Sequence, residues 1–307
     1  MATMGMMDSI MELLHSYQNG NSLVHIFENG TKIRETDDDA FIPTIPESMD
    51  VKITNQCSLE NYCKWCHEGS TKNGEHADLE ALVGVFKGLP PGVELAIGGG
   101  NPLSHPNLAW FLKTLSEMGL IANITVNELH LSEYLPLLEQ LIAERLVYGV
   151  GLTYSGKDME SLTRLNSLSD NVVYHMIAGV HDVDDLPKAP KALVLGYKKI
   201  RKGESFFSRS VEENLYRWYT KIPIYFGMVP VSFDNLALEQ LNIRRFLPQS
   251  EWDKFYMGDD GTFTFYIDGV NMEYATSSTD MNRREINGRT AEELFTDIRG
   301  NSIRSAP

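Results

Sequence analysis

The sequence predicts an α/β protein whose core is a partial (β/α)6 barrel of parallel strands. From residue 51 onward, short apolar runs alternate with helix-like segments, an order typical of a parallel sheet with helices on its outer face. The chain has 307 residues, 42% of them apolar, which is enough to bury such a core. We expect an N-terminal helix and β-hairpin segment over 1–48, the core over 49–200, and a small α+β C-terminal extension over 201–307.

The N-terminal segment is expected to hold the helix first and the hairpin second. Apolar residues recur at helical spacing over 8–17. Residues 23–35 form two alternating runs around Asn29-Gly30, which is a favoured hairpin turn. A linker with several aspartates and prolines, over 36–48, then leads into the core.

The core is expected to contain six strands whose carboxyl ends share one edge of the sheet. In parallel α/β folds the loops at that edge carry the active site, so we expect the functional residues there. The predicted strands span 51–54, 93–97, 121–126, 146–153, 171–178 and 192–197, and the predicted helices span 78–88, 107–118, 131–144, 158–166 and 184–187.

Beyond residue 201 the strand–helix alternation breaks down. The final element is expected to be a helix, because Thr290 and Glu293 have the spacing of a capping box. The elements expected before it are a strand over 222–226, a helix over 236–241, and a hairpin over 261–275 that turns at Asp268-Gly269.

The charge balance restricts the partners of the chain. It has 27 Lys and Arg against 42 Asp and Glu, a net charge of −15, which argues against a nucleic-acid partner because phosphate binding needs excess cations. No apolar run has the length of a membrane span, and the first residues lack the pattern of a secretory signal. We therefore expect a cytoplasmic protein with no membrane contact.

All three cysteines lie within ten residues, at Cys57, Cys63 and Cys66, in the loop after the first core strand. Three thiols cannot all pair within one chain, so their grouping indicates a metal site. Three thiolates leave one coordination position without a protein ligand, which is typical of a reactive centre. The alternatives are a structural zinc site completed by His67, and unliganded thiols. Adjacent residues rarely bind one ion together, and the polar loop argues against buried inert thiols.

Three features of the chain carry a family resemblance: the cysteine loop, an aromatic residue before its last cysteine, and a glycine-rich end to the second core strand. The residues are Cys57, Cys63, Cys66, Trp65, Gly98, Gly99, Gly100, Asn101 and Pro102. Together they resemble the radical S-adenosylmethionine (SAM) enzymes. The resemblance implies a 4Fe–4S cluster on the three cysteines, with SAM bound at the open iron. It also implies reductive cleavage of SAM to a 5′-deoxyadenosyl radical, which abstracts hydrogen from a substrate.

The resemblance further implies how SAM would be held. Trp65 would lie beside the adenine, and the glycines would let the backbone approach the methionyl ammonium. The hydroxyls of Thr153 and Ser155 would bind the ribose or carboxylate. Contacts to the adenine are implied for Ile177, Gly179 and Leu195.

The chain departs from the common family pattern in two ways. Five residues, rather than three, separate Cys57 from Cys63, which is a variant spacing known in the family. Asn101 stands where an acidic residue is usual, so it accepts a hydrogen bond but brings no charge. The C-terminal extension has no cysteine, which excludes an auxiliary cluster there.

Substrate and partners are inferred from the same resemblance. A small reducing protein such as flavodoxin or ferredoxin is the implied electron donor. The C-terminal extension resembles those of peptide-modifying members, which favours a peptide or protein substrate over a nucleoside or small metabolite. The basic run Lys198–Lys202 follows the sixth strand, and we expect it to contact an anionic group of the substrate. No general acid or base is assigned, and His67, His130, His175 and His181 are expected to be structural. The competing hypothesis is a catalytically silent scaffold that holds zinc or an iron–sulfur cluster.

Overall fold

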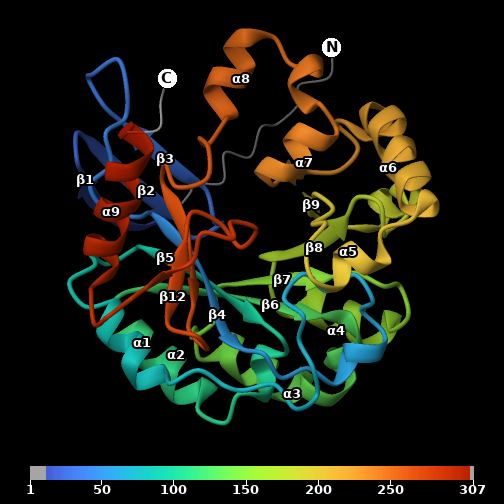
Figure 1. Ribbon diagram of the computed structural model, residues 1–307, viewed down its shortest axis with the longest axis horizontal. Helices are drawn as coiled ribbons and strands as arrows, with labels where there is room; N and C mark the ends of the chain where they lie inside the picture. Colours follow the sequence, from blue (N-terminus) through green and yellow to red (C-terminus); the bar gives the residue numbers. More distant parts are fainter. Residues whose placement is uncertain (1–11, 305–307) are drawn as a thin grey trace, which may run out of the picture.

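We analysed a computed structural model, which describes residues 12–304. Its main element is a ten-stranded sheet in the order β10-β9-β8-β7-β6-β5-β4-β11-β12-β13. Neighbours from β10 to β11 pair in parallel, whereas β12 and β13 continue the sheet antiparallel. The sheet bends round from β4 through β6 and β7 to β8, and so forms an open barrel (Figure 1).

The six predicted core strands and the helices between them are confirmed. They lie next to one another in the sheet in reverse chain order, as successive right-handed βαβ units would place them. The strands are β4 (Ser48–Thr54), β5 (Glu94–Gly99), β6 (Ile121–Asn127), β7 (Gly149–Thr153), β8 (Val172–Ile177) and β9 (Ala192–Leu195), and the helices are α1 (Leu79–Val85), α2 (Leu108–Glu117), α3 (Leu131–Ala143), α4 (Met159–Leu168) and the 3-10 helix η4 (Val183–Lys188).

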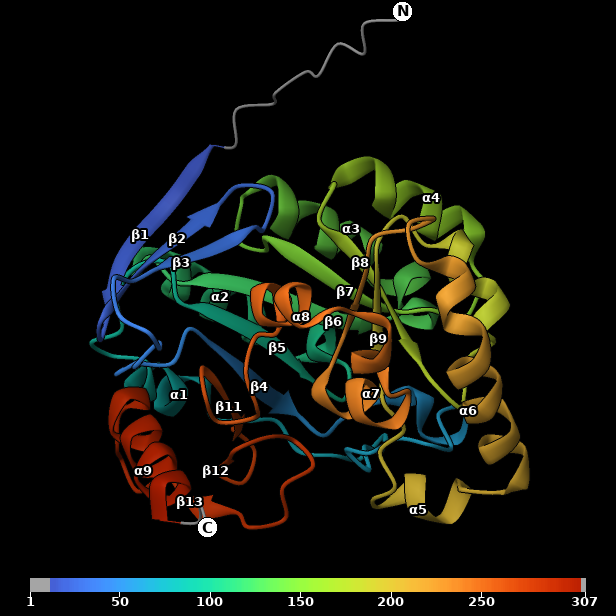
Figure 2. The ribbon, with the colours of Figure 1, turned by 90° about the horizontal axis from the view of Figure 1, so that it is seen from above.

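The two faces of the barrel sheet differ in chemistry because side chains alternate along each strand. On β4, for example, Val51 and Ile53 are buried, with α1 to α4 on the outer side of the sheet, whereas Asp50 and Lys52 point to the concave side. Figure 2 shows α7 and α8 in front of that concave side. The outer face therefore makes the core, and the concave face is left for polar groups.

The N-terminal prediction is partly wrong. Residues 13–17, expected in a helix, belong to strand β1 (Leu13–Asn19), and residues 8–11 lie outside the described residues. β1 pairs with β2 (Ser22–Phe27), and β2 pairs with β3 (Lys32–Glu35), in a separate antiparallel sheet. Every second residue at the end of β1 is buried, so period-two burial overrides the helical spacing. The hairpin at Asn29-Gly30 is confirmed.

The C-terminal extension continues the main sheet. β11 (Thr264–Asp268) pairs in parallel with β4 and antiparallel with β12 (Glu273–Ala275), which confirms the predicted hairpin. The turn lies one step later than expected, over residues 269–272, because Asp268 still pairs with Glu273 and its carboxylate accepts the nitrogens of Val270 and Asn271 in the loop. The capping box is also confirmed, since the Thr290 nitrogen donates to Glu293 Oε2 at 2.7 Å at the start of α9 (Ala291–Arg304). The remaining elements are α5 (Lys202–Phe206), α6 (Arg209–Lys221), β10 (Val231–Phe233), α7 (Asn235–Gln240), η6 (Ile243–Phe246), α8 (Gln249–Phe255) and β13 (Arg284–Glu285).

One expected strand in the extension is wrong. Ile222–Tyr225 is the 3-10 helix η5, which follows directly on α6. Pro223 has no N–H for a strand ladder but suits the first turn of a helix, and this explains the difference. Within the described residues, we find no helix that is both long and apolar enough to span a membrane.

Candidate active site

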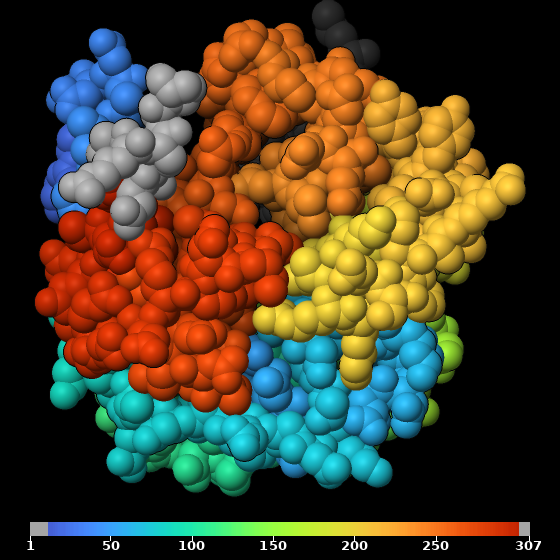
Figure 3. Space-filling model, viewed as in Figure 1, coloured from blue at the N-terminus to red at the C-terminus, as the bar shows by residue number. Residues whose placement is uncertain are grey.

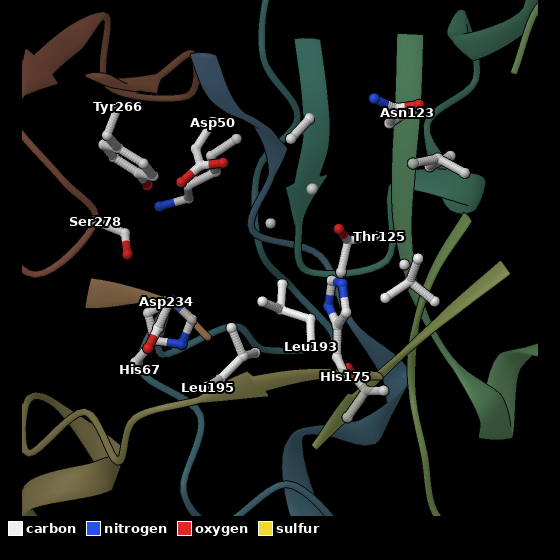
Figure 4. A pocket seen from close by; sticks show the side chains of 18 of the residues that line it. Asp50, His67, Asn123, Thr125, His175, Leu193, Leu195, Asp234, Tyr266 and Ser278 are labelled. Atoms are coloured by element: carbon white, nitrogen blue, oxygen red, sulfur yellow. The ribbon is translucent and has the colours of Figure 1, made fainter. Parts of the chain in front are cut away.

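The concave face of the barrel encloses a cavity of about 890 Å³. Its walls are the inward-pointing residues of every strand from β4 to β9, together with residues of β10 and β11 and the cysteine loop (Figure 4). Many of these residues are polar, which is unusual for the inside of a sheet and indicates a binding chamber. The polar wall residues from the strands include Asp50, Lys52, Glu94, Asn123, Thr125, Asn127, Thr153, His175, Ser232 and Tyr266.

The cysteine loop closes one end of this chamber. It follows β4, contains the short 3-10 helix η1 (Ser58–Asn61), and brings Cys57, Cys63 and Cys66 to the cavity wall. All three thiols are half-buried and none forms a disulfide. Backbone hydrogen bonds fix the loop, among them Cys57 nitrogen to Thr71 oxygen at 2.7 Å and Cys66 nitrogen to Cys63 oxygen at 3.1 Å. The sequence therefore brings its only three sulfhydryl groups to a single chamber.

The surroundings of the thiols disfavour their charged form. Burial, and then the charges of Cys66 and Cys57, raises the pKa of Cys63 to about 12. Burial also raises the pKa of Cys57. A bound metal cation would reverse these shifts, because it stabilises thiolates. No three His, Cys, Asp or Glu side chains among the described residues are arranged to hold a single metal ion, so a metal centre here stays a prediction.

Two side chains that the sequence analysis did not assign to the site contact the cysteine sulfurs. Asn127 Nδ2, at the end of β6, lies 3.8 Å from Cys63 Sγ. His130 Nε2 lies 3.6 Å from Cys57 Sγ, and burial lowers the pKa of this histidine. Such contacts orient metal ligands and tune the metal in protein sites. The sequence did offer one indication: Asn127 directly follows the predicted strand 121–126, at the carboxyl edge of the sheet where functional residues were expected.

The glycine-rich end of β5 passes directly beneath the cysteine loop. A Cβ on Gly100 would overlap the carbonyl oxygen of Gln56, and a Cβ on Gly99 would overlap that of Thr54. Gly99 also has φ +116°, a conformation that favours glycine. Gly98 is different, because its hypothetical Cβ meets only Thr125, at 3.8 Å, and would point into the chamber. These glycines therefore let two backbones pack closely at the end of the cavity.

The structure brings most of the sequence-predicted SAM contacts to the chamber but not all of them. Asn101 instead caps the 3-10 helix η2 (Pro102–Ser104), and its Oδ1 accepts the Leu103 nitrogen at 3.3 Å. Gly179 packs against Val211 and Leu215. The residues in the cavity wall are Trp65, Gly98, Gly99, Gly100, Thr153, Ile177 and Leu195, whereas Asn101, Pro102, Ser155 and Gly179 lie outside it.

The basic run after β9 divides into two parts. Lys198 Nζ is in the chamber, 2.7 Å from Ser278 Oγ and 3.4 Å from His67 Nε2. Lys202 Nζ instead donates to the carbonyl oxygen of Ser70 at 2.7 Å and so supports the cysteine loop. Of this run, only Lys198 faces the chamber, so an anion contact there is expected of Lys198 alone.

A buried ionic network joins the chamber wall to the cysteine loop and the C-terminal extension. Lys52 Nζ on β4 lies 2.9 Å from Asp268 Oδ2 on β11 and 3.3 Å from Glu68 Oε2. The hydroxyl of Tyr266 lies 3.2 Å from Glu68, and Figure 4 shows this tyrosine beside Asp50 in the chamber. Burial raises the pKa of Asp50. We therefore expect a charged ligand in the chamber to change this pKa strongly.

His175 lies on β8 and its side chain lines the chamber. Its ring lies against Gly151 of the neighbouring strand, so the small residue on β7 makes room for the imidazole. Burial, and then the charge of Lys198, lowers the pKa of His175 to about 4. The ring is thus neutral near pH 7 and faces the chamber as a hydrogen-bonding group.

Comparison with known proteins gives a structural match without sequence support. No protein-family model matches the chain, and neither does any curated protein sequence. Among solved structures, SuiB of Streptococcus suis bound to SAM superposes with a TM-score of 0.60 at 12% identity, covering 86% of this chain and 69% of SuiB. SuiB bound to its precursor peptide SuiA gives a TM-score of 0.58, also at 12% identity, over 86% of this chain and 68% of SuiB.

A third SuiB structure covers 93% of this chain and 86% of SuiB, with a TM-score of 0.56 and 12% identity. The match confirms the predicted fold class and, at the level of the fold, the resemblance drawn from the cysteine motif. The chain thus has the α/β fold of SuiB, a protein that binds SAM, with a C-x5-C-x2-C loop at one end of its central chamber.

Proposed function

We propose that this protein is a radical SAM enzyme that acts on a peptide. One observation carries the proposal: the three cysteines, Trp65 and the glycine end of β5 all face one chamber, although they come from separate parts of the chain. The fold around them resembles that of a protein captured with SAM. A scaffold protein would have no need of a polar chamber that opens onto three half-buried thiols.

The donor set fits a 4Fe–4S cluster with one open iron. Cys57, Cys63 and Cys66 would hold it, and Asn127 and His130 would contact the sulfurs. A cluster held there would supply the electron for reductive cleavage of bound SAM, the source of the radical that abstracts hydrogen in this chemistry. We assign the protein contacts to SAM to the predicted residues in the wall: Trp65, Gly98, Gly99, Gly100, Thr153, Ile177 and Leu195.

Two observations support a peptide substrate. SuiB was captured with its precursor peptide SuiA. In this chain the chamber wall includes both ends of β5, from Glu94 to Gly99, a distance of roughly 16 Å at the usual rise of a strand. SAM would occupy the Gly98–Gly99 end of this wall. A flexible chain segment could reach it along the rest of the wall, from the Glu94 end.

The enzyme hypothesis is tested by anaerobic reconstitution of the full chain. We expect about four irons per chain and release of 5′-deoxyadenosine from SAM on reduction with dithionite. Cys63→Ser should abolish both, whereas Lys64→Ala, at an exposed position of the same loop, should retain both. Bound zinc with no cleavage of SAM would support the scaffold hypothesis instead. Cleavage that survives Cys63→Ser would show that the ligands are assigned wrongly.

The substrate class is tested by deuterium transfer. The reconstituted protein is incubated with SAM and with separate pools of deuterated peptides, nucleosides and small metabolites. Label that enters 5′-deoxyadenosine only from the peptide pool would support the proposal. Label that enters only from another pool would overturn the peptide assignment without affecting the radical SAM assignment.

A further inference from the structure

Two exposed apolar side chains, from segments far apart in the sequence, surround one buried ring at the amino end of the barrel. Phe41, in the linker after β3, is 40% exposed, and Met257, in the loop after α8, is 51% exposed. The rings of Phe41 and the buried Phe263 are in edge contact, with centroids 6.3 Å apart. Arg34 Cζ lies 4.0 Å from the centre of the Phe263 ring, and Arg34 Nη1 lies 3.5 Å from Met257 Sδ. We call Phe41, Met257 and Phe263 the apolar strip.

The apolar strip is continuous with the wall of the chamber. Met257 and Phe263 belong to both. The carbonyl oxygen of Phe263 accepts the Glu47 nitrogen at 2.8 Å, and the Glu47 oxygen accepts the Glu94 nitrogen at 3.1 Å, so Phe263 lies at the Glu94 end of the wall. The residues that we assign to SAM on β5 lie at the opposite end of this strand. A chain segment that enters from the Glu94 end would therefore pass the strip before it reaches SAM.

Neighbouring residues extend this apolar surface. Ile42 directly follows Phe41, Phe255 is two residues before Met257, and both are exposed. Figure 3 shows the two segments that carry the strip, in blue and in orange, at the top of one face of the molecule. Exposed apolar side chains are ordinary when they are scattered, but a group that continues into a binding chamber indicates a surface that a ligand covers.

The charges beside the strip argue against a second copy of this chain as the ligand. Residues 37–44 and 253–263, which carry the strip, contain six aspartates and one lysine, in a chain whose net charge is −15. Two copies in symmetric contact through this surface would bring the same acidic groups against one another, which is unfavourable. An apolar peptide segment with few acidic side chains meets no such repulsion.

We propose that the apolar strip binds an apolar segment of the peptide substrate outside the chamber, and so holds the adjoining part of the peptide at the Glu94 entrance. The inference rests on the proposed function, since the ligand has to reach from the strip to the SAM end of the chamber. No bond forms or breaks at the strip, which contributes affinity but no chemistry. Its loss should therefore raise KM for the peptide and leave kcat unchanged.

The test compares two pairs of substitutions in the reconstituted full chain. Phe41→Ser with Met257→Ser alters the strip. Trp110→Ser with Met159→Ser is the matched control, because it also removes one ring and one methionine, which are 45% and 57% exposed on α2 and α4. The probe is a pool of peptides from digested, deuterated cell protein, which reversed-phase chromatography splits into a polar and an apolar fraction. Label entering 5′-deoxyadenosine is measured against peptide concentration, and SAM cleavage without peptide and the oligomeric state are measured for every variant.

With the unsubstituted protein, we expect the apolar fraction to reach half-maximal label transfer at a lower concentration than the polar fraction. The strip pair should raise this concentration about tenfold for the apolar fraction, because two side chains no longer bury apolar surface against the peptide. The maximal rate, and SAM cleavage without peptide, should stay within about twofold. The control pair should leave all three quantities within about twofold.

Equal half-saturating concentrations for the two pairs would overturn the docking proposal, as would equal use of the two fractions by the unsubstituted protein. A strip pair that dissociates an oligomer, with label transfer unchanged, would assign the strip to contacts between copies of this chain. Ile42→Ser is a milder variant for the case that the strip pair also loses SAM cleavage without peptide. It should raise the half-saturating concentration about threefold, and no rise would overturn the proposal. Absence of label from both fractions, with SAM still cleaved, would instead overturn the peptide assignment of the proposed function.

Discussion

The carboxylate of Glu128 binds the backbone of Ser155, and its Oε2 lies 2.5 Å from the Ser155 nitrogen. Its two oxygens accept the N–H groups of all four residues 155–158. Burial by itself would raise the pKa of Glu128, but the four donors outweigh it and hold the pKa below that of an ordinary glutamate. The loop after Thr153 in the chamber wall therefore takes its shape from a side chain at the end of the neighbouring strand.

Glu128→Gln should destabilise the protein by about 2–3 kcal/mol at pH 7. The amide keeps one accepting oxygen but turns an NH2 group toward backbone donors, so charge-assisted hydrogen bonds are lost. Urea denaturation measures the effect, and Glu117→Gln, at an exposed position of α2, is the matched control. A loss no larger than that of the control would contradict this role of Glu128.

The contribution of Glu128 should also depend on pH in one direction. Its folded pKa is lowered from 4.5, so its stabilisation is fully present above that value and disappears as pH falls through the folded pKa. The stability difference between the unsubstituted protein and Glu128→Gln should thus be constant from pH 7 to about pH 5 and shrink below it. A difference that grows on acidification would show the opposite shift.

Lys52→Met should be strongly destabilising, by about 3–5 kcal/mol, because it leaves the buried carboxylates of Asp268 and Glu68 without their cation. Adding Asp268→Asn to this variant should recover part of the loss, since one uncompensated charge is removed. Denaturant unfolding of both single variants and of the double variant measures this recovery. Strictly additive losses would show that the two residues do not interact.

Two glycines of the run 98–100 should respond differently to alanine. Gly100→Ala should destabilise the fold by several kcal/mol, because its Cβ would overlap the Gln56 carbonyl oxygen. Gly98→Ala has space and should cost only about 1 kcal/mol or less, while its methyl group enters the chamber. Thermal unfolding separates the two, and equilibrium dialysis of SAM against reconstituted Gly98→Ala should show weaker binding. Unchanged SAM binding would place the ligand away from β5.

Asn127→Asp should make the reduction potential of a reconstituted cluster more negative. The substitution keeps the acceptor that caps Leu129 but replaces the amide donor near Cys63 with a negative charge. A redox titration followed by electron paramagnetic resonance measures the potential. Asn61→Asp adds the same charge at an exposed loop position and should shift it less. Equal shifts would mean that the contact between Asn127 and Cys63 has no specific effect.

The sequence by itself determined the parallel core and the end of that core at which the cysteine loop lies. Apolar runs separated by helical segments leave little choice of topology, because βαβ crossovers are right-handed and place sequential strands side by side. The cysteine loop follows β4 directly, so its place at the carboxyl edge of the sheet followed as well. The hairpin at Asn29-Gly30 and the capping box at Thr290 were equally readable, because each depends on only a few adjacent residues.

Only the tertiary structure decided which of these residues meet. β11 joins β4 across more than 200 residues of chain, and Lys52, Asp268 and Glu68 become one network through that pairing. No local pattern encodes such contacts, because they depend on how the sheet continues at its edge. For the same reason Asn127 and His130 could not be assigned to the sulfurs in advance, and residues 13–17 became a strand once β2 was there to pair with them.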